Sequence, residues 1–137
     1  MTPHRIVNPD SLAPPSGYAH AVVAAPGRCV YLGGQIAAGP DGVCRGETLL
    51  EQFGRALDNV VTALEAAGAA PTDVVSLQIF VTDVGEYRRS ARALGEEYRS
   101  RFGRHYPAVA LVGVTELFDP AALVELVAIA VVAEETP

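Results

Sequence analysis

Glu125 is the only charged residue in an apolar stretch from Ala121 to Ala133, which reads AALVELVAIAVVA. A stretch so rich in β-branched residues and leucine predicts a strand that is buried on both faces. A carboxylate in such a strand loses hydration, so it must find a partner, take up a proton or border a cavity. The pattern therefore presents Glu125 either as a general acid/base or as a structural residue, paired with an arginine or with backbone N–H groups at a subunit interface.

The next candidates are the glycine pair Gly33-Gly34, with Gln35 after it, and the aromatic residue Tyr18. Adjacent glycines permit backbone conformations closed to other residues and let N–H groups approach a ligand closely; a bulge or tight bend is the alternative. Tyr18 can donate a phenolic hydrogen bond in a cleft or simply pack at a strand end. His20 shares the strand face of Tyr18, where we expect a packed or hydrogen-bonded neutral imidazole.

The composition indicates one soluble domain over residues 1–137, because 50% of the residues are hydrophobic and the mean hydropathy is +0.24. No apolar run reaches the ~20 residues of a membrane-spanning helix, and the first residues do not resemble a signal peptide. We therefore expect a cytoplasmic protein. Cys29 and Cys44 lack the spacing of a metal site or a disulfide scaffold, so we expect reduced thiols and no metal.

The net charge of −6 argues against a general polyanion binder. All the basic residues are arginines, and six of them lie on or just after the second helix predicted below: Arg88, Arg89, Arg92, Arg99, Arg101 and Arg104. A solvated face balanced by neighbouring glutamates is one reading of this group. The other is an RNA-interacting surface, but no nucleophile or histidine pair accompanies it, so nucleic acid is an unfavoured partner.

The periodicity of apolar residues predicts two helices, one over residues 47–67 ending at Gly68 and one capped by Asp83 and ending at Gly103. Residues 1–17 predict an extended lead-in without regular structure. Five strands are expected at residues 18–25, 28–32, 74–81, 108–115 and 121–133, the first two forming a hairpin across Pro26-Gly27.

This order, β-β-α-β-α-β-β, predicts an α+β fold with a single sheet and two helices on one face. Two helices cover only one face, yet the last three strands lack the alternation of a sheet whose other face meets water. We therefore expect that face to pack against other copies of the chain, in a homo-oligomer with pockets between subunits.

The chain resembles the reactive-intermediate deaminase family, also called YjgF-like (RidA) and often labelled endoribonuclease L-PSP. The resemblance runs from about residue 5 to residue 132. It rests on motifs in common order and spacing: Gly17-Tyr18, GGQIA at 33–37, Gln52 and Asn59, AAG at 66–68, VTD at 81–83, Pro107-Ala108 and VELVAIAV at 124–131.

The resemblance implies a homotrimer of chorismate-mutase-like subunits with three clefts at the subunit interfaces. It implies hydrolysis of enamine and imine intermediates to 2-oxo acids and ammonia in those clefts, without metal or cofactor. Position by position, Glu125 matches the glutamate that handles water or a proton, Tyr18 a tyrosine at the cleft, and Gly34 a glycine whose backbone faces the ligand.

The chain departs from the deaminase pattern in the residues that would bind substrate. Val109 stands where deaminase members have an arginine that clamps the substrate carboxylate, and it supplies neither donor nor charge. Leu111 replaces a common cysteine, Gly33 a common serine, and Arg92 a common asparagine. PAVALVGV instead resembles the PASTLVGV of branches that lack the clamp. Arg92 could swing into the cleft and partly replace the missing arginine.

The sequence thus predicts an imine or enamine hydrolase that uses Glu125 on a substrate other than the usual 2-iminoacids. A non-catalytic binding or scavenging module that lost the clamp is the first alternative, and an RNA-interacting protein is the second.

Overall fold

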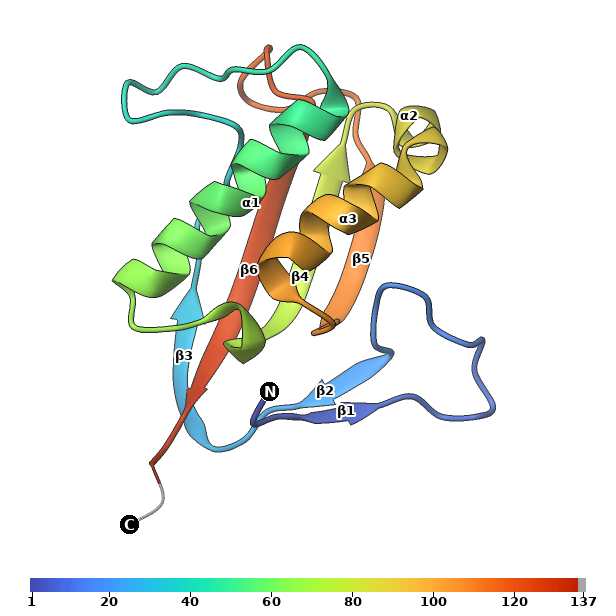
Figure 1. The fold of residues 1–137 in the computed structure, drawn as a ribbon, viewed down its shortest axis with the longest axis vertical. Coiled ribbons are helices and arrows are strands. Elements are labelled where there is room, and N and C mark those ends of the chain that lie inside the picture. Colours follow the sequence, from blue (N-terminus) through green and yellow to red (C-terminus); the bar gives the residue numbers. More distant parts are fainter. Residues whose placement is uncertain (136–137) are drawn as a thin grey trace.

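The computed structural model describes residues 1–135, and Figure 1 shows their arrangement. In chain order the elements are β1 (Arg5–Val7), β2 (Ala21–Val23), β3 (Gly27–Tyr31), α1 (Leu49–Ala66), the 3-10 turn η1 (Pro71–Asp73), β4 (Val74–Val81), α2 (Val84–Arg89), α3 (Ala91–Phe102), β5 (Ala108–Gly113) and β6 (Val124–Ala133). None of the helices in residues 1–135 is both long and apolar enough to cross a bilayer.

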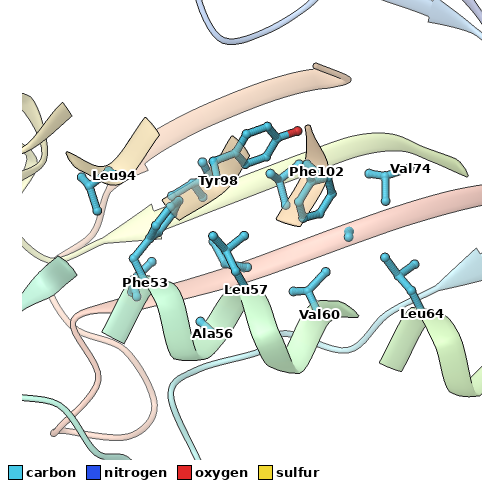
Figure 2. Close-up of a cluster of buried hydrophobic side chains, with 14 of the residues drawn as sticks. Phe53, Ala56, Leu57, Val60, Leu64, Val74, Leu94, Tyr98 and Phe102 are labelled. Atoms are coloured by element: carbon cyan, nitrogen blue, oxygen red, sulfur yellow. The ribbon is translucent and has the colours of Figure 1, made fainter. Parts of the chain in front are cut away.

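Helix α1 forms where the apolar periodicity predicted it. Thr48 caps its start, since the hydroxyl accepts a hydrogen bond from the Glu51 backbone N–H at 3.2 Å. Gly68, with φ +79°, ends it in the left-handed conformation that glycine adopts without steric cost. Its apolar stripe packs with α3 and the sheet in the buried cluster of Figure 2. Both boundaries predicted from the sequence are confirmed within two residues.

The second predicted helix is divided into α2 and α3 at Ser90. Asp83 caps α2 as predicted, because its carboxylate accepts from the Glu86 backbone N–H at 3.0 Å. Ser90 leaves the helical conformation (φ −102°, ψ 9°), and serine is a residue that favours helix ends. The break lets α3 pack its own stripe of Leu94, Tyr98 and Phe102 against the core.

The main sheet has the strand order β3-β6-β4-β5, in which β6 is antiparallel to β3 and β4, and β4 is parallel to β5. Helices α1 and α3 cover one face of it (Figure 1). The predicted α+β class is therefore confirmed. The face without helices is called the open face below.

Strand β6 alternates between the two faces, so the prediction of a strand buried on both was wrong for the single chain. Val124, Leu126, Ala128 and Ala130 are 0% exposed and belong to the core under the helices. The intervening residues, Glu125 among them, lie on the open face and are half-buried. The sequence does not show this alternation, because small or apolar residues occupy both the core-facing and the open-face positions of β6.

The prediction of one sheet was also wrong, because β2 pairs with β1 and not with β3. The lead-in therefore contains a strand, and residues 1–25 form an N-terminal arm below the end of the main sheet (Figure 1). Gly27 approaches β6 so closely that a Cβ there would lie 2.1 Å from the Val132 carbonyl oxygen. The chain enters β3 through Pro26 without a hairpin ladder to β2.

Buried His4 holds the arm against the sheet. Its Nδ1 accepts from the Ala25 N–H at 3.0 Å, so Nε2 carries the proton and donates to the carbonyl oxygens of Val131 at 2.9 Å and Asp73 at 3.2 Å. One side chain thus joins the arm to β6 and to the end of η1.

Buried Gln52 holds the loops that flank the sheet. The side-chain amide donates to the carbonyl oxygens of Gly46 at 3.0 Å and Ala121 at 2.9 Å, and its oxygen accepts from the Leu123 N–H at 2.8 Å. The segment that leads into β6 is therefore fixed to α1, which sets the position of Glu125 two residues later.

Candidate functional site

Glu125 and Gly34 lie in direct contact at the start of β6. Glu125 is opposite Phe80 of β4 and projects on the open face. A Cβ added to Gly34 would lie 2.2 Å from Oε2 of Glu125, so the carboxylate occupies the space that any side chain at position 34 would need. The sequence singled out both residues without indicating that they touch.

A β-bulge brings Gly34 to this position. The Leu32 N–H donates to the Ala128 carbonyl oxygen at 3.0 Å, and Gln35 and Leu126 exchange two backbone hydrogen bonds of 2.8 and 2.9 Å. From Leu32 to Gln35 is three residues, whereas from Ala128 to Leu126 is two, so the glycine pair contains one extra residue. This confirms the bulge that was one of the two readings of Gly33-Gly34.

The glycines do not serve the conformational role that the sequence suggested. Among the described residues, positive φ occurs at five glycines, and neither Gly33 nor Gly34 is one of them. A Cβ at Gly33 would meet nothing within 4 Å. Position 34 therefore requires glycine for space beside the carboxylate, and not for a left-handed backbone.

No salt bridge in residues 1–135 includes Glu125. Glu125 is therefore not paired with any described arginine of the same chain, which was one of the alternatives predicted from the sequence. A hollow of about 460 Å³ lies against Gly34 and Gln35, between α1 and the loop that follows β3. Glu125 does not line this hollow, since it lies on the open face of the sheet.

Tyr18 lies at the other edge of the sheet, next to β5. The Ala19 N–H donates to the Pro107 carbonyl oxygen at 2.9 Å, and Ala19 bridges Ala108 in parallel orientation. Tyr18 meets His20 edge to face, with ring centroids 5.2 Å apart. His20 Nε2 bonds the Ala13 carbonyl oxygen at 2.7 Å, so the prediction of a hydrogen-bonded imidazole is confirmed.

Val109 lies beside Tyr18, and the two residues line a shallow hollow of about 270 Å³ at this edge. Val109 is paired with Leu77 and Leu111 with Ile79, so both also pack against the core on the helix side. The structure therefore gives Leu111 a packing role and leaves Val109 between the core and the edge hollow.

Within one chain, the predicted site residues fall into two separate groups. Glu125 is opposite Phe80 and Val109 is opposite Leu77, with two strand spacings between β6 and β5. At ~3.3 Å per residue and ~4.8 Å per strand, the Glu125 and Val109 backbones are about 14 Å apart. Their side chains also project on opposite faces, so one subunit alone does not assemble the predicted cleft.

The arginine group does not reach Glu125 in the same chain. Arg92 is exposed on α3, in the layer on the far side of the sheet from Glu125. Arg101 has a structural role, since it pairs with Asp58 of α1 at 2.6 Å and with Glu97 at 2.7 Å. This pairing fits the reading of a charge-balanced helix face.

Sequence reasoning missed Phe80 as a neighbour of Glu125. The β4–β6 register that pairs them is fixed by packing of both strands under the helices, and nothing local in the sequence reports it. Among residues 1–135, no group of three or more His, Cys, Asp or Glu side chains is placed to hold a metal ion.

Comparison with known proteins identifies the family. The profile of the endoribonuclease L-PSP family matches residues 8–132. A 2-iminobutanoate/2-iminopropanoate deaminase of Dermatophagoides farinae is 31% identical over 120 residues, which are 85% of this chain and 88% of the relative. A RutC family protein of Pyrococcus abyssi is 31% identical over 106 residues, 76% of this chain and 79% of the relative.

Among solved structures, the Rid family protein YyfB of Yersinia pestis, a protein of unknown function, superposes with a TM-score of 0.84. It is 32% identical, and the match covers 94% of this chain and 98% of that one. With the family profile over most of its length and this fold in common, the chain belongs to the endoribonuclease L-PSP family, that is, the YjgF/RidA family.

Proposed function

We propose that this protein is a homotrimer whose interface clefts hydrolyse an imine or enamine by acid/base catalysis from Glu125, without a cofactor. The observation that carries the proposal is the Glu125 carboxylate itself. It is half-buried on the open face, in contact with Gly34, and within residues 1–135 no arginine forms a salt bridge with it. The family relative named as an iminobutanoate deaminase supports the reaction class.

A carboxylate in this position can take up the proton from water and return it to the leaving nitrogen in imine hydrolysis. With the imine in its protonated form, Glu125 takes a proton from water as the water oxygen bonds to the carbon and the C=N bond becomes single, which gives a neutral carbinolamine. In the second step the glutamic acid returns this proton to the amino group and the C–N bond breaks. The departing ammonia or amine takes the hydroxyl proton, and the oxygen becomes the carbonyl. For an enamine, protonation of the carbon by Glu125 comes first and gives the imine.

The open face supports assembly with other copies because it is apolar and uncovered. Tyr31 is 74% and Val112 is 44% exposed, and both lie on this face with the half-buried Val127 and Ile129. Phe118, in the loop before β6, is fully exposed. Apolar surface of this kind on one sheet face marks an interaction site, and a symmetric assembly would cover it.

Assembly would also explain why the site residues lie on two edges of the subunit. The Gly34 and Glu125 group at the β3–β6 side of one copy would face the Tyr18 and Val109 group at the β5 edge of the next. Each cleft would then contain residues from two chains.

Mixing two inactive variants tests this arrangement. If each cleft uses Glu125 from one chain and Tyr18 from another, an equal mixture of Glu125→Gln and Tyr18→Phe chains, refolded together, regains about a quarter of the wild-type rate. The measurement is ammonia release from an imine substrate, with the assembly mass determined by light scattering against three times the 14.3 kDa chain. Each variant refolded alone is the control. No recovery in a mixed trimer would place both residues in the same chain's site, and a monomeric mass would reject the assembly.

Substituting Val109 by arginine tests the substrate side of the proposal. An arginine at this edge position could leave the core through the hollow shared with Tyr18 and bind a carboxylate by two hydrogen bonds. We expect KM for 2-iminopropanoate to fall about tenfold. Ala67→Arg adds an arginine at an exposed position just after α1 that does not line this hollow; it is the control and should leave KM unchanged. No gain from Val109→Arg would mean that the cleft has diverged at more than this position.

A further inference from the structure

Another hollow lies away from Glu125, between the N-terminal arm and the end of α3. Its volume is about 640 Å³, within the range of small-molecule sites. The arm contributes Ile6, Asn8 and Tyr18 to its lining, and the segment that ends α3 contributes Phe102, Arg104 and Tyr106. Neither Glu125 nor Gly34 is part of it.

The side-chain charge of this hollow is opposite in sign to that of the whole chain. The chain has 16 acidic and 10 basic residues, yet neither Asp nor Glu lines the hollow. Arg104 does line it, is exposed, and forms no salt bridge within residues 1–135. Burial lowers the pKa of His105, which also borders the hollow, so its imidazole is neutral at pH 7. Arg104 therefore gives the hollow a net positive side-chain charge.

One wall of the hollow is aromatic. Tyr98 stacks on Phe102 with ring centroids 4.6 Å apart and on Tyr106 at 5.6 Å, and both pairs have interplanar angles of 15°. Phe102 and Tyr106 are the lining members of this stack. The Tyr98 hydroxyl donates to the His105 carbonyl oxygen, which fixes the stack to the segment that contains Arg104. A fixed aromatic border beside a guanidinium is complementary to a compact hydrophobic group attached to an anion.

We propose that this hollow binds a small aromatic carboxylate, with the carboxylate on Arg104 and the ring against Phe102 and Tyr106. The site goes beyond the proposed hydrolase function, because its ligand would be held by Arg104, Phe102 and Tyr106 and would not contact Glu125; Tyr18 is the cleft residue that also lines it. Its ligand would contact the arm and the body of the subunit at once. Since Tyr18 lines both this hollow and the hollow at the β5 edge, occupancy would hold Tyr18 in its place.

Calorimetric titration with phenylacetate and with its neutral isostere phenylacetamide tests the site in the full-length protein. The wild type should bind the carboxylate about tenfold more tightly than the amide, because only the carboxylate gains charge-assisted hydrogen bonds. Arg104→Gln should abolish this preference and leave amide affinity unchanged. Arg99→Gln removes an exposed arginine of α3 that does not line the hollow, and should behave as wild type.

Two further variants locate the bound probe. Thr72→Phe places a ring in the hollow from η1 and should block both ligands. Glu125→Gln should leave binding unchanged, so failure of this proposal and failure of the hydrolase proposal are distinguishable. Equal affinity for acid and amide, equal losses from Arg99→Gln and Arg104→Gln, or absence of binding at millimolar phenylacetate would each overturn the proposal. The proposal would also be overturned if Glu125→Gln lost binding while Arg104→Gln bound as the wild type does. The probe would then occupy the Glu125 cleft.

Discussion

Glu125→Gln should reduce kcat/KM for imine hydrolysis by about 10²- to 10⁴-fold, the range that positioned general acid/base groups contribute. The amide keeps the shape of the side chain and its place against Gly34, but it does not take up and return a proton. The measurement is coupled detection of ammonia released from 2-iminopropanoate generated in situ. Circular dichroism and assembly mass should match those of the wild type.

Glu65→Gln is the matched control for this substitution, because Glu65 is exposed on α1 and remote from the open face. Its rate should equal that of the wild type. An unchanged rate in Glu125→Gln would remove Glu125 from the mechanism. A wild type that turns over no imine but still binds small carboxylates at the Glu125 cleft would favour the binding or scavenging module.

Gly34→Ala should lower the same rate by about 10²-fold while leaving the fold intact. The added Cβ would lie 2.2 Å from Oε2 and 2.8 Å from Cδ of Glu125, so the carboxylate must move by an ångström or more. A displacement of about 1 Å at a catalytic group costs on the order of 10²-fold in rate. The obstructing atoms are the end of a flexible side chain, so we expect the free energy of unfolding to change by no more than about 0.5 kcal/mol.

Gly33→Ala separates this steric effect from any effect on the bulge. Gly33 is in the same bulge, has no positive φ, and its added Cβ would meet nothing within 4 Å. We expect this variant to retain the wild-type rate and stability in kinetic and denaturant-unfolding measurements. Equal losses in the two variants would indicate that the bulge itself, and not the contact with Glu125, is what the rate depends on.

The parts of the fold that were predicted correctly are those specified by local sequence. The helix α1 is set by a stripe with helical spacing, by Thr48 at one end and by Gly68 at the other, all within one segment. The capped start of α2 at Asp83 is specified in the same way. Strands β4, β5 and β6 were located because long apolar runs allow few alternatives.

The errors concern partners that are distant in sequence. β2 pairs with β1 and not with β3, in an arm that His4 fixes to the sheet by a hydrogen bond to the Val131 carbonyl oxygen, 127 residues away in the chain. The contact of Glu125 with Gly34 likewise depends on register between two strands far apart in the chain. Sequence patterns identified Glu125 and Gly34 but not His4, and the pairing is decided by packing that no local window contains.

The extra residue in the bulge determines which side chain is the neighbour of Glu125. Tyr31 is opposite Ile129, so an uninterrupted ladder would place Gln35 opposite Glu125, whereas the structure pairs Gln35 with Leu126. Without the bulge, the same residues in a regular ladder would therefore place the glutamine side chain directly opposite the acid. In this segment the number of residues matters as much as their identity, so insertions and deletions here would alter chemistry before they alter the fold.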